Sequence, residues 1–258
     1  MNARVFALSA LLVALMPAQA AVSVSNLTNS TYTQTFDTLA SSGSTGTALP
    51  AGWELYRVVG SSAPVAVSSY SVGTGSGTTG AIYSYGAAGS SDRALGALAS
   101  NSFGGGVMAL SLLNDTGHAL AGLSLSYDGE QWRSASGAGV QSLVLEYGFG
   151  DTYGAVSSWS SLGADFASPV TLGTSSLYGS GNTTGLVSGI TGGATLSWAN
   201  GQTLWLRWVD ANDSGSDHGL AIDNLSVSIT SAVPEPSSYA MLLAGLGTVG
   251  FVARRRRK

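Results

Sequence analysis

The chain of 258 residues contains no cysteine and only two histidines, His118 and His218. The absence of cysteine excludes disulfide scaffolds, thiolate zinc sites, cysteine nucleophiles and thiol redox chemistry. Two histidines are too few for a metal centre built mainly from imidazole ligands. These two absences remove the thiol and multi-histidine classes of functional site.

Charged residues are also scarce, at 9% of the chain, and their two signs are separated along it. Five of the ten basic residues form the C-terminal run 254–258. Residues 21–233 hold four arginines against 13 acidic residues, which is a net charge of −9. Because so acidic a segment lacks the clustered Lys and Arg side chains that bind phosphates, we expect no nucleic-acid partner.

Apolar and small residues dominate instead. The hydrophobic share is 44%, and glycine alone accounts for 36 residues. Disordered chains combine low hydrophobicity with high net charge, so this composition favours a folded domain. The central part of the chain, roughly 200 residues, is long enough to bury the core of one domain.

The first 20 residues have the features of a secretory signal peptide. A positively charged start precedes an apolar run over residues 5–16, and small residues stand at Ala18 and Ala20. The run is shorter than the roughly 20 apolar residues that a membrane-spanning helix needs. We expect a signal helix over residues 1–20 that is cleaved after Ala20; the alternative is a retained N-terminal anchor.

Residues 232–258 combine three features in a defined order. They are the motif Pro234-Glu235-Pro236, the uncharged stretch 237–253, and the cations Arg254, Arg255, Arg256, Arg257 and Lys258. As a helix the uncharged stretch reaches about 25 Å, the lower limit for a membrane span. The adjacent cations favour the cytoplasmic side. These features predict a C-terminal transmembrane helix that, taken alone, is an ordinary anchor.

The same three parts in this order resemble the PEP-CTERM sorting signal, which an exosortase-type membrane transpeptidase recognises. The resemblance implies that Pro234, Glu235, Pro236 and the four terminal arginines are recognition residues without a catalytic role. It implies export through the inner membrane, temporary anchoring by the C-terminal helix, and a final location at the cell surface or outside the cell. The signal occurs in bacteria that make exopolysaccharide and biofilm, so exopolysaccharide is an expected partner.

The central segment, residues 21–231, predicts an all-β domain. Leu123, Leu125 and Tyr127 alternate with serines, and the same alternation recurs over residues 143–149, 204–209 and 225–229. Such strands, bounded by Gly, Ser, Asn and Asp, predict an antiparallel β-sandwich of jelly-roll type with about 12 strands in two sheets.

A change of parity within the last predicted strand indicates a β-bulge. Leu220 and Ile222 are out of phase with Leu225, so an extra residue is expected near Asp223 and Asn224. Phe36-Asp37 near the start and Ile222-Asp223 near the end fit a sandwich whose first and last strands lie together. A buried aspartate in either place needs a backbone amide, an arginine or an ion as partner.

Several stretches resemble the jelly-roll domains of secreted, surface-anchored bacterial proteins. They are residues 35–39 with 49–53, 90–96, 126–133, 205–210 and 219–224. The resemblance implies a lectin-like sandwich and a location outside the cell, and it implies no particular activity.

The segment from Asp210 to Asp223 is the strongest candidate for a metal site. Its opening matches the oxygen-ligand spacing of a calcium loop, but Ala221 occupies the twelfth position, where an EF-hand needs a bidentate glutamate. A looser calcium site is one hypothesis, with the ligands Asp210, Asn212, Asp217 and Asp223. The alternative is a polar hairpin loop held by Asx turns, with no cofactor.

Arginine and tryptophan lie close together in two predicted strands. Arg133 follows Trp132, and Arg207 lies between Trp205 and Trp208. We expect these two arginines to be structural, stacked on rings and paired with carboxylates. The alternative is a sugar-binding surface whose stacking ring belongs to one of three residues, which alternation alone does not distinguish: Trp53, Tyr153 or Trp159.

Signs of catalysis are weak. Asp128 and Glu130 fall on one strand face and could form a carboxylate pair for glycoside hydrolysis. The closely spaced Glu-x-Asp-x-Glu strand of lectin-like glycosidases is absent, and no G-x-S-x-G elbow presents a serine nucleophile. We therefore expect no enzymatic activity.

These observations favour an exported, non-enzymatic protein of the cell surface or extracellular matrix, associated with exopolysaccharide or biofilm. The alternative is a carbohydrate-binding module, with or without calcium. A secreted glycoside hydrolase or lyase is a lesser alternative.

Overall fold

A computed structural model describes residues 19–171, 177 and 184–231. The predicted C-terminal helix and the motif Pro234-Glu235-Pro236 lie outside these residues, as does the signal segment apart from Gln19 and Ala20. Within the described part of the chain, no helix has the length and apolar character that crossing a membrane requires.

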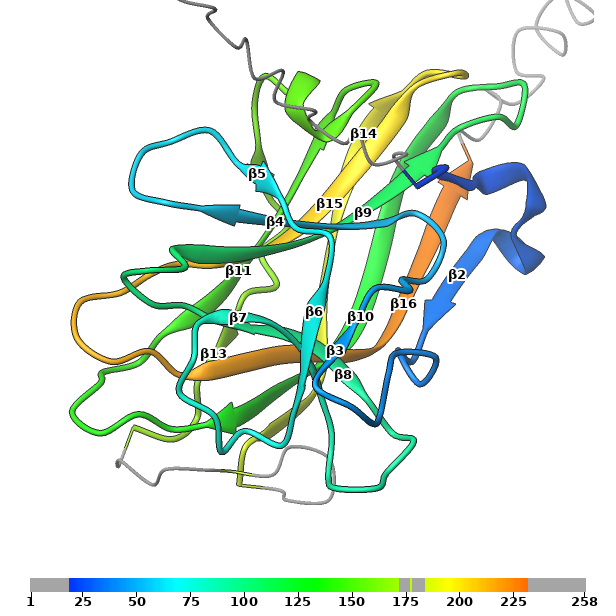
Figure 1. The fold of residues 1–258 in the computed structure, drawn as a ribbon. Helices are drawn as coiled ribbons and strands as arrows, with labels where there is room; N and C mark the ends of the chain where they lie inside the picture. The colour runs from blue at the N-terminus through cyan, green and yellow to red at the C-terminus, as the bar shows by residue number, and fades with distance from the viewer. Residues whose placement is uncertain (1–18, 172–176, 178–183, 232–258) are drawn as a thin grey trace, which may run out of the picture.

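The described residues form a β-sandwich of two eight-stranded sheets (Figure 1). The first sheet contains β1 (Val22–Ser23), β4 (Trp53–Val58), β5 (Val65–Ala66), β9 (Gly105–Leu113), β11 (Ser142–Phe149), β12 (Ser160–Ser161), β13 (Phe166–Ala167) and β15 (Thr203–Asp210). The second contains β2 (Thr31–Gln34), β3 (Thr45–Gly46), β6 (Tyr70–Gly73), β7 (Ala81–Tyr85), β8 (Ala94–Leu98), β10 (Leu120–Arg133), β14 (Leu186–Trp198) and β16 (Gly219–Ser231). Three 3-10 helices complete the described structure: η1 (Val24–Asn26), η2 (Thr28–Ser30) and η3 (Tyr153–Ala155). The predicted all-β sandwich of two sheets is confirmed.

The strand count and the pairing differ from the prediction in two ways. The described residues carry sixteen strands rather than about 12, because five of them (β1, β3, β5, β12 and β13) are two residues long. So short a segment shows no alternation in the sequence. Two pairs, β1 with β9 and β6 with β7, are parallel, whereas all the other pairs are antiparallel.

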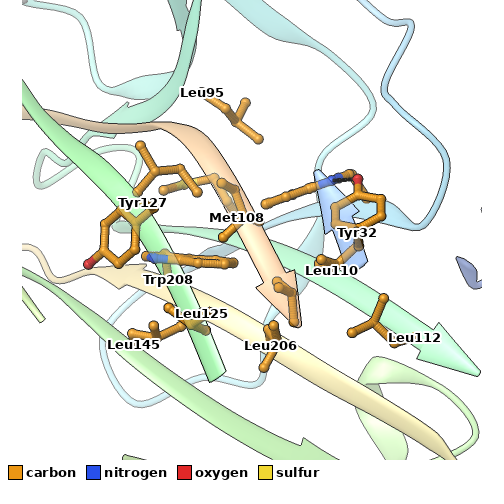
Figure 2. Packing of buried hydrophobic residues seen from close by; sticks show 14 of the residues in the cluster. Tyr32, Leu95, Met108, Leu110, Leu112, Leu125, Tyr127, Leu145, Leu206 and Trp208 are labelled. Atoms are coloured by element: carbon orange, nitrogen blue, oxygen red, sulfur yellow. Dashed lines mark hydrogen bonds between the residues drawn. The ribbon is translucent and has the colours of Figure 1, made fainter. Parts of the chain in front are cut away.

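Alternation along the strands correctly predicted the residues that face the core. Leu125 and Tyr127 of β10 and Leu206 and Trp208 of β15 are buried between the sheets, and Figure 2 shows them with Met108 of β9. The Tyr127 ring meets the Trp208 ring edge-on, with centroids 5.7 Å apart. Large side chains from both sheets therefore fill the space between them.

The predicted bulge and the pairing of the end strands are both present. Ser126 of β10 pairs with Ser226, but Asp128 pairs with Asp223, so β16 has one extra residue between these pairs. Asn224 has a φ of 50° there, a left-handed conformation that asparagine tolerates. The strands β2 and β16 lie side by side, so the beginning and end of the domain meet in the second sheet (Figure 1).

Candidate functional site

The outer face of the first sheet carries polar and aromatic side chains. Because Leu55 of β4 and Leu206 of β15 point into the core, their neighbours Tyr56 and Trp205 point outward. Tyr153, in η3 just after β11, belongs to the same outer cluster. This part of the sheet is thus covered by a loop rather than by another sheet.

A pocket of about 440 Å³ opens between this loop and strands β4, β9 and β15. Its wall combines aromatic rings, hydroxyl groups and two carboxylates. The residues lining it include Thr47, Glu54, Tyr56, Ser68, Ser111, Asp151, Thr152, Tyr153, Thr203 and Trp205, with Gln19 and Ala21 at the N-terminal side. The volume lies within the range of natural small-molecule sites.

The aromatic part of the pocket is held by ring contacts. The rings of Tyr56 and Tyr153 stack with centroids 4.0 Å apart, and Tyr153 meets Trp205 edge-on at 5.7 Å. The indole N–H of Trp205 donates to the carbonyl of Gly150 at 2.9 Å, which fixes the loop to β15. Ring contacts of this kind stabilise by about 0.5–1.5 kcal/mol each beyond the area they bury.

Arg207 lies behind the pocket and is fully engaged in structural contacts. Its Nη2 and Nε donate to Glu146 Oε2 at 2.6 and 2.8 Å, and its Nη1 donates to the hydroxyl of Tyr153 at 3.2 Å. The guanidinium carbon is 3.9 Å from the ring centroid of Trp159. The predicted stacking and pairing of Arg207 are confirmed, whereas the corresponding role of Arg133 stays a prediction.

Burial separates the three predicted stacking residues. Trp53 lies wholly within the core, and Tyr153 is 4% exposed beneath its neighbours. Trp159 is the only one of the six tryptophans that is not buried. Of the three predicted stacking residues, Trp159 is therefore the one that is accessible from the surface.

The two pocket carboxylates, Glu54 and Asp151, were not predicted. The hydroxyl of Tyr56 donates to Glu54 Oε2, and burial together with the adjacent Glu54 carboxylate raises the pKa of Tyr56 above its usual value. The alternation of Trp53 and Leu55 with Glu54 and Tyr56 is the sequence signal that could have identified this wall. Asp151 carries no such signal, because it lies in a loop.

The predicted calcium ligands fall into two places. Asp210 ends β15 and is buried with its Oδ2 unpartnered; burial raises its pKa well above the usual range, and the charges of Asp217 and Asp213 add to this. Asp217 Oδ1 accepts a hydrogen bond from the backbone N–H of Asp213 at 2.9 Å. The side-chain amide of Asn212 donates to Asn101 Oδ1 at 3.2 Å. Asp223 lies apart from these three residues, in β16.

Asp223 belongs to a second group of carboxylates at the bulge of the second sheet. Burial, together with the smaller effect of the charges of Glu130, Asp92 and Asp37, raises its pKa to about 8; its Oδ1 has no partner among the described residues. Burial likewise raises the pKa of Glu130 to about 7, although the Trp132 indole donates to it at 2.7 Å. Asp37 Oδ1 accepts the backbone N–H of Arg93 at 3.2 Å, one of the partners expected for it.

Neither place shows a preformed metal centre. Among residues 19–171, 177 and 184–231, no group of three or more His, Cys, Asp or Glu side chains is arranged to hold an ion. The structure therefore does not bring Asp210, Asn212, Asp217 and Asp223 together, and calcium binding stays a prediction.

The residues considered for catalysis have structural partners instead. Asp128 accepts the backbone N–H of Gly189 at 2.8 Å and the side-chain amide of Asn224 at 3.0 Å. Glu130 is 2% exposed, and neither carboxylate lines the pocket. His218 accepts from the N–H of Ala135 through Nδ1 and contacts the Gly139 carbonyl through Nε2.

Comparison with known proteins identifies the C-terminal segment. Residues 232–257 match the model of the PEP-CTERM protein-sorting motif. No curated protein matches the chain.

Several solved structures are similar at low sequence identity. The CBM22-1 xylan-binding domain of Xyn10C from Paenibacillus barcinonensis is 12% identical with a TM-score of 0.39, over 78% of this chain and 95% of that chain. The Stig cyclase Fisc from Fischerella sp. TAU is 14% identical with a TM-score of 0.36, over 70% and 86% of the two chains. The motif at residues 232–257, rather than these distant likenesses, identifies the chain as an exported protein that carries a PEP-CTERM sorting signal.

Proposed function

We propose that this is a non-enzymatic protein of the cell surface or extracellular matrix whose β-sandwich binds carbohydrate, with exopolysaccharide as its ligand. An N-terminal signal peptide delivers it, and an exosortase-type membrane transpeptidase processes the C-terminal signal. The observation that supports carbohydrate binding is the pocket on the outer face of the first sheet, where aromatic rings and oxygen acceptors line the same cavity.

The chemistry of the pocket matches that of a sugar. A pyranose has apolar C–H faces that pack on aromatic rings, here those of the partly exposed residues Tyr56 and Trp159, which both contact the buried ring of Tyr153. Its hydroxyl groups donate to carboxylates, here Glu54 and Asp151, and a charge-assisted hydrogen bond is stronger than a neutral one. Both requirements are met without a cofactor.

The positions of the acids with raised pKa favour binding of the glycan without hydrolysis. Retaining and inverting glycosidases need two carboxyl groups about 5–9.5 Å apart across the scissile bond, one of which donates a proton. The carboxylic acids with raised pKa are Glu130, Asp210, Asp217 and Asp223, and none of them lines the pocket. Release of reducing sugar from any bound glycan would instead support the hydrolase alternative.

A glycan array with the full chain tests the proposal. We expect binding to chains of neutral hexoses or hexosamines, weakened at least about tenfold by Tyr56→Ala and by Trp159→Ala. Val140→Ala is the matched control, because Val140 is 65% exposed and lies outside the pocket. An array without any hit contradicts carbohydrate binding and leaves an exported surface protein with another role.

A further inference from the structure

The charge of the pocket indicates which glycans it accepts, an inference that rests on the proposed function. Glu54 and Asp151 line the cavity, and no Lys, Arg or His among the described residues does so. Arg207, the cation behind Tyr153, is already paired with Glu146. The cavity therefore presents negative charge to its ligand.

Both carboxylates have accepting capacity left for a ligand. The Tyr56 hydroxyl occupies Oε2 of Glu54, and Oε1 has no partner within the described residues. Asp151 is exposed, and the described part of the chain provides it with no hydrogen-bond or ion-pair partner. Ionised carboxylates accept hydrogen bonds and cannot donate them, so the ligand must supply the donors.

The predicted N-terminal processing does not reverse this charge. Cleavage after Ala20 removes Gln19 from the cavity and leaves the α-ammonium group of Ala21 at its rim. One cation then faces two carboxylates, so the net charge of the lining stays negative. Anionic sugars are disfavoured in either form by repulsion and by desolvation of the carboxylates.

We propose that the pocket selects glycans with free amino groups, meaning chains of de-N-acetylated hexosamine, over chains that carry uronate or phosphate. A protonated amine brings three hydrogen-bond donors and a positive charge, which complement the negative lining that Glu54 and Asp151 provide. The apolar face of the same sugar packs on the ring of Tyr56, which Tyr153 supports from its other side. A uronate instead brings its negative charge into a cavity whose net charge is already negative.

Calorimetric titration of the full chain with three hexamers tests this selectivity: glucosamine, N-acetylglucosamine and galacturonate, at a mildly acidic pH and at low and high salt. We expect glucosamine to bind at least about tenfold more tightly than its acetylated form, and galacturonate most weakly. Glu54→Gln and Asp151→Asn should each remove most of the preference for the free amine.

Asp213→Asn is the matched control, since it also removes one negative charge. Asp213 follows the far end of β15, whereas Thr203 at the beginning of that strand lines the pocket. An equal loss in Asp213→Asn overturns the proposal, because the attraction would then belong to the acidic domain as a whole. Binding of galacturonate as tightly as glucosamine also overturns it.

The three hexamers also separate this inference from the function on which it rests. If acetylated and free hexosamines bind equally, the pocket binds glycans but the amine selectivity is wrong. If no hexamer binds, the carbohydrate-binding function itself is contradicted. Unchanged melting temperatures of the variants confirm that the effects belong to the pocket.

Discussion

Two buried acids, Glu130 and Asp223, distinguish the second sheet at the level of single residues. Both are at most 3% exposed, and each lies near further negative charges rather than an arginine. A carboxyl group in such surroundings holds its proton to a higher pH than it does in the unfolded chain. The protein should therefore respond to pH through these side chains.

We predict that the free energy of unfolding falls as pH rises from about 6.5 to about 8.5. The pKa of Asp223 is about 8 and that of Glu130 about 7 in the folded state, above the ordinary values of 3.8 and 4.5. In this range the folded chain binds protons that the unfolded chain has lost. Each unit of pH therefore lowers the free energy of unfolding by up to about 1.4 kcal/mol per such proton. Thermal melting across this range measures the slope.

Asp223→Asn should flatten that slope, and the control Asp151→Asn, at an exposed loop position, should leave it unchanged. A melting temperature that is constant or rises with pH in the parent chain contradicts the prediction. Calcium binding at Asp223 would appear in the same experiment. Added calcium would then raise the melting temperature most at the alkaline end, a chelator would reverse the gain, and Asp223→Asn would abolish it.

Arg207 provides a second prediction at the residue scale. Arg207→Lys keeps the charge but loses the planar fork to Glu146 and the stacking on Trp159. Because both partners are partly exposed, we expect a loss of about 1 kcal/mol in the free energy of unfolding. Arg57→Lys is the control in denaturant titration, since Arg57 has no ion pair within the described residues; equal losses in both variants would contradict the structural role of Arg207.

At the scale of strands and turns, the connection between β8 and β9 depends on a glycine. Gly104 has a φ of +85°, and a Cβ there would lie 2.1 Å from the Val58 carbonyl oxygen of β4. Its N–H donates to the Ser100 carbonyl at 2.7 Å, closing the turn. The turn thus needs both the left-handed conformation and the missing side chain.

Gly104→Ala should therefore lower the free energy of unfolding by about 2–4 kcal/mol. Gly60→Ala is the matched variant, because Gly60 has a φ of +57° but a Cβ added there would meet no atom within 4 Å. Gly60→Ala should lower the free energy of unfolding only by the cost of a left-handed conformation for alanine, about 1–2 kcal/mol. Equal losses in the two variants would show that contact with Val58 contributes nothing.

At the scale of the whole molecule, the sorting signal and the proposed binding pocket occupy separate parts of the chain. Residues 232–257 match the sorting motif, whereas the residues that line the pocket lie between Gln19 and Trp205. Sorting and processing should then depend on the tail, and ligand binding should not.

Replacing Pro234-Glu235-Pro236 by three alanines should block processing, so that the chain keeps its full C-terminal mass and remains with the membrane fraction. Mass spectrometry and fractionation of cells measure both properties. Ser237→Ala with Ser238→Ala is the control, which should be processed normally. Unchanged size and location of the triple variant would contradict recognition of the motif.

Alternation and composition correctly predicted the β-sandwich, the bulge and the terminal motif, because each depends on local features of the sequence. The inward positions of Leu125, Tyr127 and Leu206, the bulge at Asn224 and the terminal motif each depend on residues close together in the chain. Short strands such as β5 and β12 escaped prediction because two residues carry no period. The calcium ligands were chosen by spacing, which places residues along a loop but not between sheets.

The amino-acid sequence by itself determined the all-β architecture, the acidic character of the domain and the sorting signal, because period, charge and a contiguous motif are properties of the chain. Only the tertiary structure decided which side chains meet. It joined Glu54 to Asp151 in one pocket and separated Asp223 from Asp210. It also buried Trp132 against Tyr85 outside the main core, together with Glu130, which accepts the indole N–H of Trp132. Strand register and the covering loops create these contacts between distant segments, and no local pattern encodes them.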